Sequence, residues 1–422
     1  MELFDRLADE IEHAWRATWY DELAFPRIAS EALAKANLHE RVTPWQILES
    51  LGTSPGLTEQ RDLPGGFSNL PLTLANRPRF FIDLYLWLDG TTTIHQHSFA
   101  GAFQVLEGSS LHSRYRFDES RRINDHFRLG EVVFESSELL RQGAVSEIIP
   151  GSSFAHSLFH LARPSATITV RTFQLATQTP QFDYLKPSIA IDHFFSDQLT
   201  TKRVRTVALM LATPHQDAEL VIRECLRTAD AHTAFLLLAE VNKWTRQPSL
   251  RQMFEPGAID QRAADLVEFA RTLHGELIDK YVEVFSAENR AVEIIKRRGQ
   301  VSQDAQRYFL ALLLNLPDRD QIIKLMWAYS PQVDPMEHIL ELIDGLGNTR
   351  VLQSAEPNVL GLPEWNEGYL FLVELMLAGK SMPEIFAAVK EEWPYPGEVA
   401  DEWVIEACRE LRESILQNLL HE

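Results

Sequence analysis

The sequence predicts an α+β multidomain protein in which a central β-barrel domain is flanked by two helical regions. Three observations support this class: helical apolar spacing near the N-terminus, short aromatic and β-branched segments between turns in the middle, and helical periodicity thereafter. At 422 residues, the chain exceeds the size of one ordinary hydrophobic core. The expected units are an N-terminal helical segment at 1–60, the barrel at 61–185 and an all-α region at 200–422.

Residues 1–60 carry the spacing of amphipathic helices. Apolar side chains recur every three or four residues at the start, which places them on one helix face. They are Leu3, Leu7, Ile11 and Trp15. Thr43 followed by Pro44 is typical of a helix start, because threonine caps free N–H groups and proline fits the first turn. We therefore expect this segment to be helical.

Residues 78–175 change to the pattern of short strands. The segment Phe80–Trp87 is rich in aromatic and β-branched side chains, which favour strands. Turn residues follow at intervals, among them Gly108-Ser109, Pro150-Gly151 and Arg163-Pro164. Short strands at this spacing predict a β-sandwich or a small barrel.

From residue 200 onward the periodicity is helical again. Segments such as Asp217–Leu226 and Met336–Ile343 place apolar residues at helical spacing. No fixed repeat period is apparent, so two architectures stay open: a globular helical domain and a stack of helical pairs.

Composition narrows the partners and the compartment. The formal net charge of −20 argues against nucleic acid and anionic membranes as partners, because both require a basic surface. No run reaches the ~18 apolar residues of a transmembrane helix, and the N-terminus lacks an apolar signal core. We therefore expect a cytoplasmic protein. Cys225 and Cys408 are expected to be separate thiols.

Two histidine-bearing segments offer the strongest indication of function. His95 and His97 are two residues apart, so on a strand their side chains point to the same side. His156 follows the Pro150-Gly151 turn about sixty residues later. A third imidazole arriving from another strand would complete a three-histidine cradle for a metal ion.

These segments resemble the two sequence motifs of the cupin superfamily. The first motif, a glycine, a histidine pair and a second glycine, is matched by Gly90, His95, His97 and Gly108. The second is matched by Gly143, Pro150-Gly151, His156 and His160. Over about residues 78–175 the chain is similar to the three-histidine branch of the cysteine (thiol) dioxygenases. The resemblance implies that the central domain is a cupin β-barrel, also called a double-stranded β-helix.

The resemblance also implies a ligand set. Many metal-binding cupins add a glutamate after the histidine pair, and here the substitute position is Ala102. Gln104 shares its face, but a neutral amide is a weak ligand. The site implied is therefore His95, His97 and His156 alone. Such a triad leaves positions on Fe²⁺ open for dioxygen and a chelating substrate, and Mn²⁺, Ni²⁺ or Zn²⁺ are the alternative metals.

Three further residues are candidates for catalysis. A two-residue hairpin at Gly108-Ser109 would pair Ala102 with Tyr115 and turn the Tyr115 phenol toward the metal. The same register would turn the side chains at positions 112, 114 and 116 outward. A shift by one residue would reverse both statements.

Arg171 and His160 complete the candidate site. A hairpin around Arg163-Pro164 would place Arg171 opposite His156, where a guanidinium could bind a substrate carboxylate. The alternative is a solvated edge arginine with Ile168 and Val170 facing the core. His160 shares the face of His156 on a regular strand and could act as an acid or base near neutral pH.

Two functions follow from these expectations. The first is a mononuclear non-haem iron(II) oxygenase of the dioxygenase type, acting with dioxygen on a small anionic or thiol-bearing molecule. The alternative is a non-catalytic cupin that senses a ligand or serves as a scaffold, with the helical region mediating homo-oligomers or contacts with a protein partner. Over half of the chain is helical and outside the histidine site, and this observation motivates the non-catalytic alternative.

Overall fold

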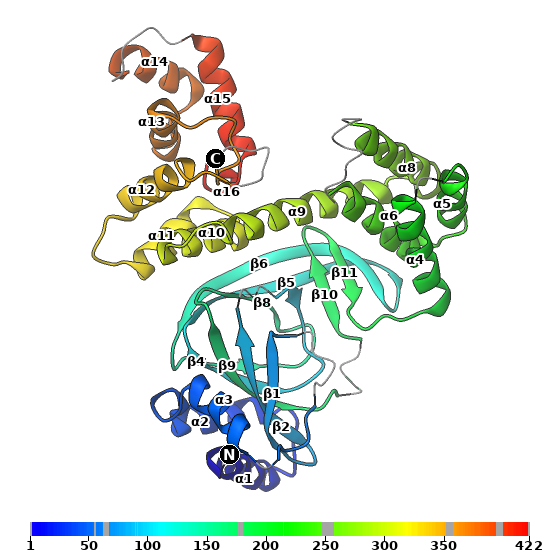
Figure 1. Cartoon of the computed structure of the whole chain (residues 1–422), viewed down its shortest axis with the longest axis vertical. Coiled ribbons are helices and arrows are strands. Elements are labelled where there is room, and N and C mark those ends of the chain that lie inside the picture. Colours follow the sequence, from blue (N-terminus) through cyan, green and yellow to red (C-terminus); the bar gives the residue numbers. More distant parts are fainter. Residues whose placement is uncertain are drawn as a thin grey trace.

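A computed structural model gives the fold of the chain (Figure 1). It describes residues 2–54, 56–61, 67–88, 90, 92–175, 177, 180–213, 215–246, 257–351, 358–393 and 400–420.

The N-terminal helices cover the outer face of the first β-sheet. They are α1 (Glu2–Ala17), α2 (Phe25–Ala36), the 3₁₀ turn η1 (Leu38–Glu40) and α3 (Pro44–Thr53). The apolar face of α1 is buried in one core with sheet residues such as Ile82 and Val170. At α3 the Thr43 hydroxyl accepts from the Gln46 N–H and the Gln46 side chain accepts from the Thr43 N–H, a complete capping box.

The central domain consists of two antiparallel β-sheets. Its strands are β1 (Leu70–Asn76), β2 (Phe80–Trp87), β3 (Ile94–His95), β4 (Gly101–Glu107), β5 (Ser109–Asn124), β6 (Phe127–Arg141), β7 (Val145–Ile148), β8 (Ala155–His160), β9 (Ser165–Thr172), β10 (Phe182–Leu185) and β11 (Ile189–Asp192). The first sheet has the order β1-β2-β9-β4-β7. The second has the order β10-β11-β6-β5-β8-β3, and β3 pairs with β10 to close it.

This strand order identifies the fold. Strands β2 to β9 divide into β2-β9-β4-β7 on one side and β3-β8-β5-β6 on the other. That division is the two-sheet, double Greek-key order of a jelly roll, the architecture of the cupins. The predicted fold class, a cupin barrel between two helical regions, is therefore confirmed.

The chain crosses between sheets where hairpins were expected. At Gly108 it passes from β4 in the first sheet to β5 in the second, so Ala102 pairs with Glu147 and Val170 and not with Tyr115. Gly108 has φ +84°, and an added Cβ would lie 2.7 Å from the Ala162 Cβ, so the crossing requires glycine. Strands β8 and β9 also lie in different sheets. Both predicted hairpins are wrong, because β4 and β5, and likewise β8 and β9, belong to opposite sheets of the jelly roll.

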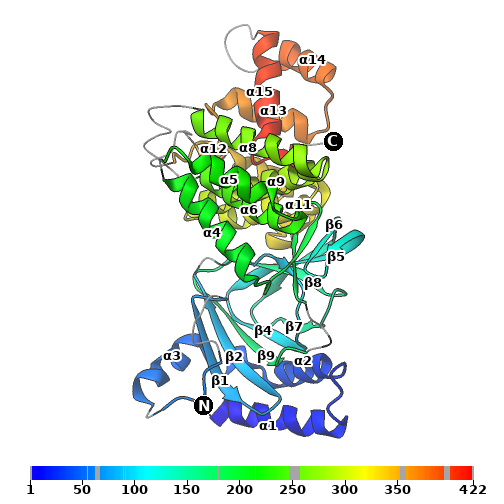
Figure 2. The same cartoon turned by 90° about the vertical axis from the view of Figure 1, so that its right-hand side faces the viewer.

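The C-terminal helices lie on the opposite side of the barrel from the N-terminal ones (Figures 1 and 2). They are α4 (Gln198–Ala212), α5 (Ala218–Arg227), α6 (Ala231–Thr245), α8 (Ala258–His274), α9 (Leu277–Arg298), α10 (Asp304–Asn315), α11 (Arg319–Tyr329), α12 (Pro335–Gly347), α13 (Glu367–Leu377), α14 (Met382–Glu392), α15 (Asp401–Glu413) and α16 (Gln417–Leu420). Strand β11 extends past residue 185, where we expected the barrel to end.

The helical region has two hydrophobic cores, and each includes residues of the barrel. Residues of α4 to α9 pack with Phe127, Leu129 and Ile189 of strands β6 and β11. Residues of α10 to α16 form a second core that includes Phe159 of β8. Cys225 and Cys408 are free thiols, as expected. Within the described part of the chain, no helix combines the length and apolar character needed to cross a membrane.

Candidate metal centre

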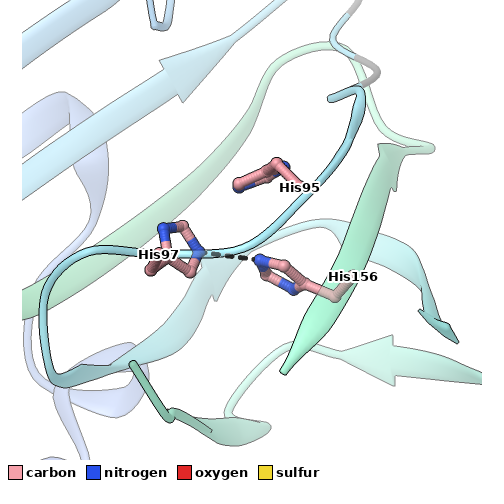
Figure 3. A group of neighbouring side chains, drawn as sticks. All are labelled: His95, His97 and His156. Carbon is pink, nitrogen blue, oxygen red and sulfur yellow. Dashed lines mark hydrogen bonds between the residues drawn. The ribbon is translucent and has the colours of Figure 1, made fainter. Parts of the chain in front are cut away.

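The three predicted histidines converge inside the barrel (Figure 3). His95 ends β3, His97 follows it in a bridge to Pro150, and His156 on β8 pairs directly with His95. One ring nitrogen from each lies within 4.8 Å of the other two, and all three side chains are buried. The jelly roll thus brings together residues about sixty positions apart in the sequence.

Hydrogen bonds fix which nitrogen of His95 faces the centre. Its Nδ1 lies 2.8 Å from the Thr93 carbonyl oxygen and donates its proton there. Its Nε2 consequently carries a lone pair, is buried, and has no hydrogen-bond partner among the described residues. The Nε2 atoms of His97 and His156 are 2.8 Å apart (Figure 3).

His156 is oriented by a residue that sequence reasoning placed outside. The Nδ1 of His156 lies 2.9 Å from the Nε2 of His112 on the neighbouring strand β5. The Nδ1 of His112 in turn lies 3.4 Å from a Glu138 carboxylate oxygen on β6. If each Nδ1 donates its proton along this chain, the Nε2 of His156 presents a lone pair to the centre. Metal-binding histidines are commonly held in this way by a partner on the second nitrogen.

Burial keeps the imidazoles neutral. It lowers the pKa of His95, and burial together with the neighbouring imidazoles holds the pKa of His97 and His156 well below the usual 6.5. Two neutral imidazole nitrogens as close as those of His97 and His156, 2.8 Å apart, need either a proton or a cation between them. The donor set therefore fits a divalent metal that accepts nitrogen ligands.

A small cavity of about 40 Å³ adjoins the three histidines. A volume of this size accommodates roughly three water-sized groups. Much of its wall is aromatic and would keep bulk water away. The aromatic residues are Phe67, Tyr85, Trp87, Phe99 and Phe103. Polar groups enter from β9, where Thr167, Thr169 and Arg171 line the cavity.

Arg171 reaches the cavity by a different route from the one expected. It pairs with Phe81 of β2 and Gly101 of β4, not with His156. Its guanidinium carbon lies 4.3 Å from the centroid of the Phe99 ring and 4.8 Å from that of Phe81. The open-edge alternative does not hold, because β9 is an inner strand with Val170 buried under the N-terminal helices and Arg171 facing inward.

The position expected to replace the glutamate ligand does not face the centre. Ala102 is packed in the core beneath the N-terminal helices. Gln104 donates from its amide to the Gly143 carbonyl oxygen at 3.3 Å. The cavity-lining residue of β4 is Phe103. Among the described residues, the metal-ligand cluster contains the three histidines and no carboxylate.

His160 lines the same cavity but differs from the expected acid or base. Its Nδ1 lies 3.0 Å from the Ser110 hydroxyl and 2.9 Å from the Ser165 hydroxyl, and its ring stacks on Trp87. Burial, with a smaller contribution from Arg298, lowers the pKa of His160 to about 3. It therefore stays neutral at physiological pH and suits a positioning role better than proton transfer.

Tyr115 lies on the wrong side of its strand for the predicted role. It pairs with Ala155 and packs against Phe182 and Tyr184, away from the three histidines. The side chain of His112 faces them instead. The predicted orientation of Tyr115 is wrong, because it assumed that β5 pairs with β4. Pairing β5 with β8, as in a jelly roll, would have given the correct orientation of Tyr115.

Fold and site together define a cupin barrel with a three-histidine centre. A scan against protein-family models and a search of curated proteins found no match. Parts of the chain superpose on solved cupin-type structures. Hydroquinone 1,2-dioxygenase from Sphingomonas sp. TTNP3 shares 13% identity over 29% of this chain and 84% of that one, with a TM-score of 0.22.

Two other structures give similar values. A cupin-2 domain containing protein from Shewanella frigidimarina shares 13% identity over 32% of this chain and 99% of that one, with a TM-score of 0.19. Recombinant oxalate oxidase shares 14% identity over 44% of this chain and 79% of that one, with a TM-score of 0.21. Strand order, and not these overlaps, identifies the barrel as a jelly roll.

Proposed function

We propose that this protein is a mononuclear non-haem iron(II) oxygenase of the dioxygenase type, acting on a small anionic or thiol-bearing molecule. The observation that carries the proposal is the convergence of three neutral imidazoles on one small, largely aromatic cavity that also contains a guanidinium. His95, His97 and His156 would hold the metal. When bound, ferrous ion would supply dioxygen activation through coordination positions that the protein leaves free.

The surrounding residues supply binding and orientation. The Arg171 guanidinium would bind an anionic group of the substrate, since it is the one charged side chain among the described residues that line the cavity. Glu138 and His112 hold the ring of His156 in one orientation. The aromatic wall limits the size of the substrate and excludes water from the reacting groups.

The test is metal analysis of anaerobically purified protein combined with oxygen uptake. We expect about one iron per chain, and we expect oxygen consumption with some member of a panel of small thiols and carboxylates. His97→Ala removes one of three ligands and should reduce iron to background and abolish uptake. His13→Ala, at an exposed position on α1, is the matched control and should retain both.

The other possible outcomes distinguish between the competing functions. Unchanged iron in His97→Ala contradicts the ligand assignment. Bound Mn²⁺, Ni²⁺ or Zn²⁺ without oxygen uptake indicates a cupin that performs non-oxidative chemistry. Absence of bound metal, with no affinity for added Fe²⁺, Mn²⁺, Ni²⁺ or Zn²⁺, supports the alternative of a non-catalytic sensing or scaffold protein whose helical region contacts a partner or a second copy.

A further inference from the structure

A second, larger cavity lies between the barrel and the C-terminal helices. Its volume is about 540 Å³, within the usual range of roughly 300–1,000 Å³ for small-molecule sites. The barrel contributes the outer faces of β3, β5, β8 and β10, and the helices contribute α9, α10 and the segment after α10. Figure 1 shows α9 running along this side of the barrel.

The cavity wall is apolar with a cationic part. Its aliphatic lining residues include Ile94 of β3 and Ile295 of α9. The charged groups among its described lining are Lys186, Arg246 and Arg290 against the single carboxylate of Glu288. This excess of positive charge stands out in a chain with a net charge of −20, and it favours an anion at this place.

Lys186 in particular lacks a counter-charge. Its ammonium lies 4.9 Å from the centroid of the Tyr115 ring at the cavity wall. Within the described residues it forms no ion pair with a carboxylate. A half-buried ammonium beside an aromatic ring is well placed to receive an anionic group.

Ser157 provides an independent indication of a ligand. The side chain lines the cavity from β8, is 3% exposed, and its buried hydroxyl has no hydrogen-bond partner among the described residues. Buried hydroxyls are nearly always paired, because an unsatisfied one has lost its hydrogen bonds to water without replacement. Tyr115 lines the same space.

We infer that this cavity is a binding site for a small amphipathic anion, with the charged head at Lys186 and an apolar body against the isoleucines of β3 and α9. The Ser157 hydroxyl would donate a hydrogen bond to the head or to a polar atom near it. The site lies on the opposite face of β3 and β8 from the metal centre, since its strand residues alternate with the ligands: Ile94 precedes His95 and Ser157 follows His156. Thr92 lines both cavities. The inference does not depend on iron or on catalysis.

The test is calorimetric titration of the full-length protein with decanoate as the anionic probe and decan-1-ol as its uncharged counterpart. We expect decanoate to bind at least tenfold more tightly than decan-1-ol. Lys186→Met keeps the aliphatic stem and removes the charge, so it should lower decanoate affinity at least tenfold and remove the preference. Lys202→Met, at an exposed position on α4, is the matched control and should bind as the wild type does.

A second variant locates the probe. Ser157→Ala removes the hydroxyl and adds no bulk, so decanoate should bind more weakly while the urea midpoint stays within error of the wild type. Failure of decanoate to bind wild-type protein with a Kd below about 1 mM would overturn the inference. Equal binding by Lys186→Met and wild type would overturn it too, provided that both unfold at the same urea concentration.

Discussion

His156 owes its orientation to two residues outside the ligand set. Its Nδ1 contacts His112, and His112 contacts Glu138. The neighbouring His112 imidazole lowers the pKa of the Glu138 carboxyl, so this carboxylate stays ionised at neutral pH. A carboxylate at the end of such a chain raises the electron density of the imidazole that binds the metal. The chain therefore supports both the position and the basicity of His156.

Removing His112 should weaken metal binding without removing a ligand. His112→Ala leaves the Nδ1 of His156 without its acceptor in a buried site. We expect affinity for Fe²⁺, or for Co²⁺ as a spectroscopic substitute, to fall about 10–100-fold. Anaerobic titration monitored by Co²⁺ absorption would measure it. Ser113→Ala is the control, because this neighbour bonds Ser137 and should leave the affinity unchanged. Equal affinities in both variants would contradict the assigned role of His112.

The sequence could predict the three histidines and not His112. Strand alternation places His95 and His97 on one side, and the cupin resemblance adds His156. Which side chains of β5 point inward, however, depends on the strands with which β5 pairs. The hairpin predicted at Gly108-Ser109 paired it with β4. In the structure β5 lies between β6 and β8, so the register with β8 decides its orientation. Long-range pairing of this kind leaves no local signal at residues 108–115.

At the level of elements, the contact of α6 with β6 contains a buried titratable group. His232 near the start of α6 stacks on Phe127 of β6 at 4.9 Å between ring centroids, and Phe195 lies on it at 4.3 Å. Burial lowers the pKa of His232 to about 4. In the unfolded chain the side chain returns to its usual pKa near 6.5. Between these two values the unfolded state binds one more proton at this position than the folded state does.

Stability should therefore fall on acidification through this window. The contribution of His232 is complete above pH 6.5 and declines toward pH 4, by up to about 1.4 kcal/mol per pH unit. His232→Phe keeps an aromatic ring in the stack and removes the titration. We expect the loss in unfolding free energy between pH 7 and pH 5 to be smaller in this variant than in the wild type. Urea denaturation at both pH values would measure the difference.

An exposed histidine supplies the control for this prediction. His13→Phe on α1 changes a side chain that meets solvent in the folded and unfolded states, so the pH dependence of stability should match that of the wild type. An identical slope in His232→Phe and wild type would show that His232 does not remain neutral in the fold. The position of such a group could not be predicted from the sequence, because α6 and β6 meet only in the folded chain.

At the scale of the whole molecule, the helical region contacts the barrel at β8, the strand that carries His156. The Arg298 guanidinium at the end of α9 is buried and donates to the backbone carbonyls of His160 and Leu161. It also lies over the Phe159 ring, with 4.2 Å from its central carbon to the ring centroid. Composition and periodicity predicted separate regions, but nothing in them indicates that α9 reaches back to β8.

Replacing Arg298 should therefore destabilise the junction. Arg298→Met keeps an aliphatic chain over Phe159 but leaves the carbonyls of His160 and Leu161 without these donors in a buried place. We expect a loss of about 1–3 kcal/mol in unfolding free energy, measured by urea denaturation. Lys296→Met, two residues earlier on α9, removes only an exposed pair with Glu293 and should cost less than about 0.5 kcal/mol. If both variants unfolded at the wild-type urea concentration, the junction would not depend on Arg298. If Arg298→Met alone lost stability, α9 would be holding the end of the strand that positions His156.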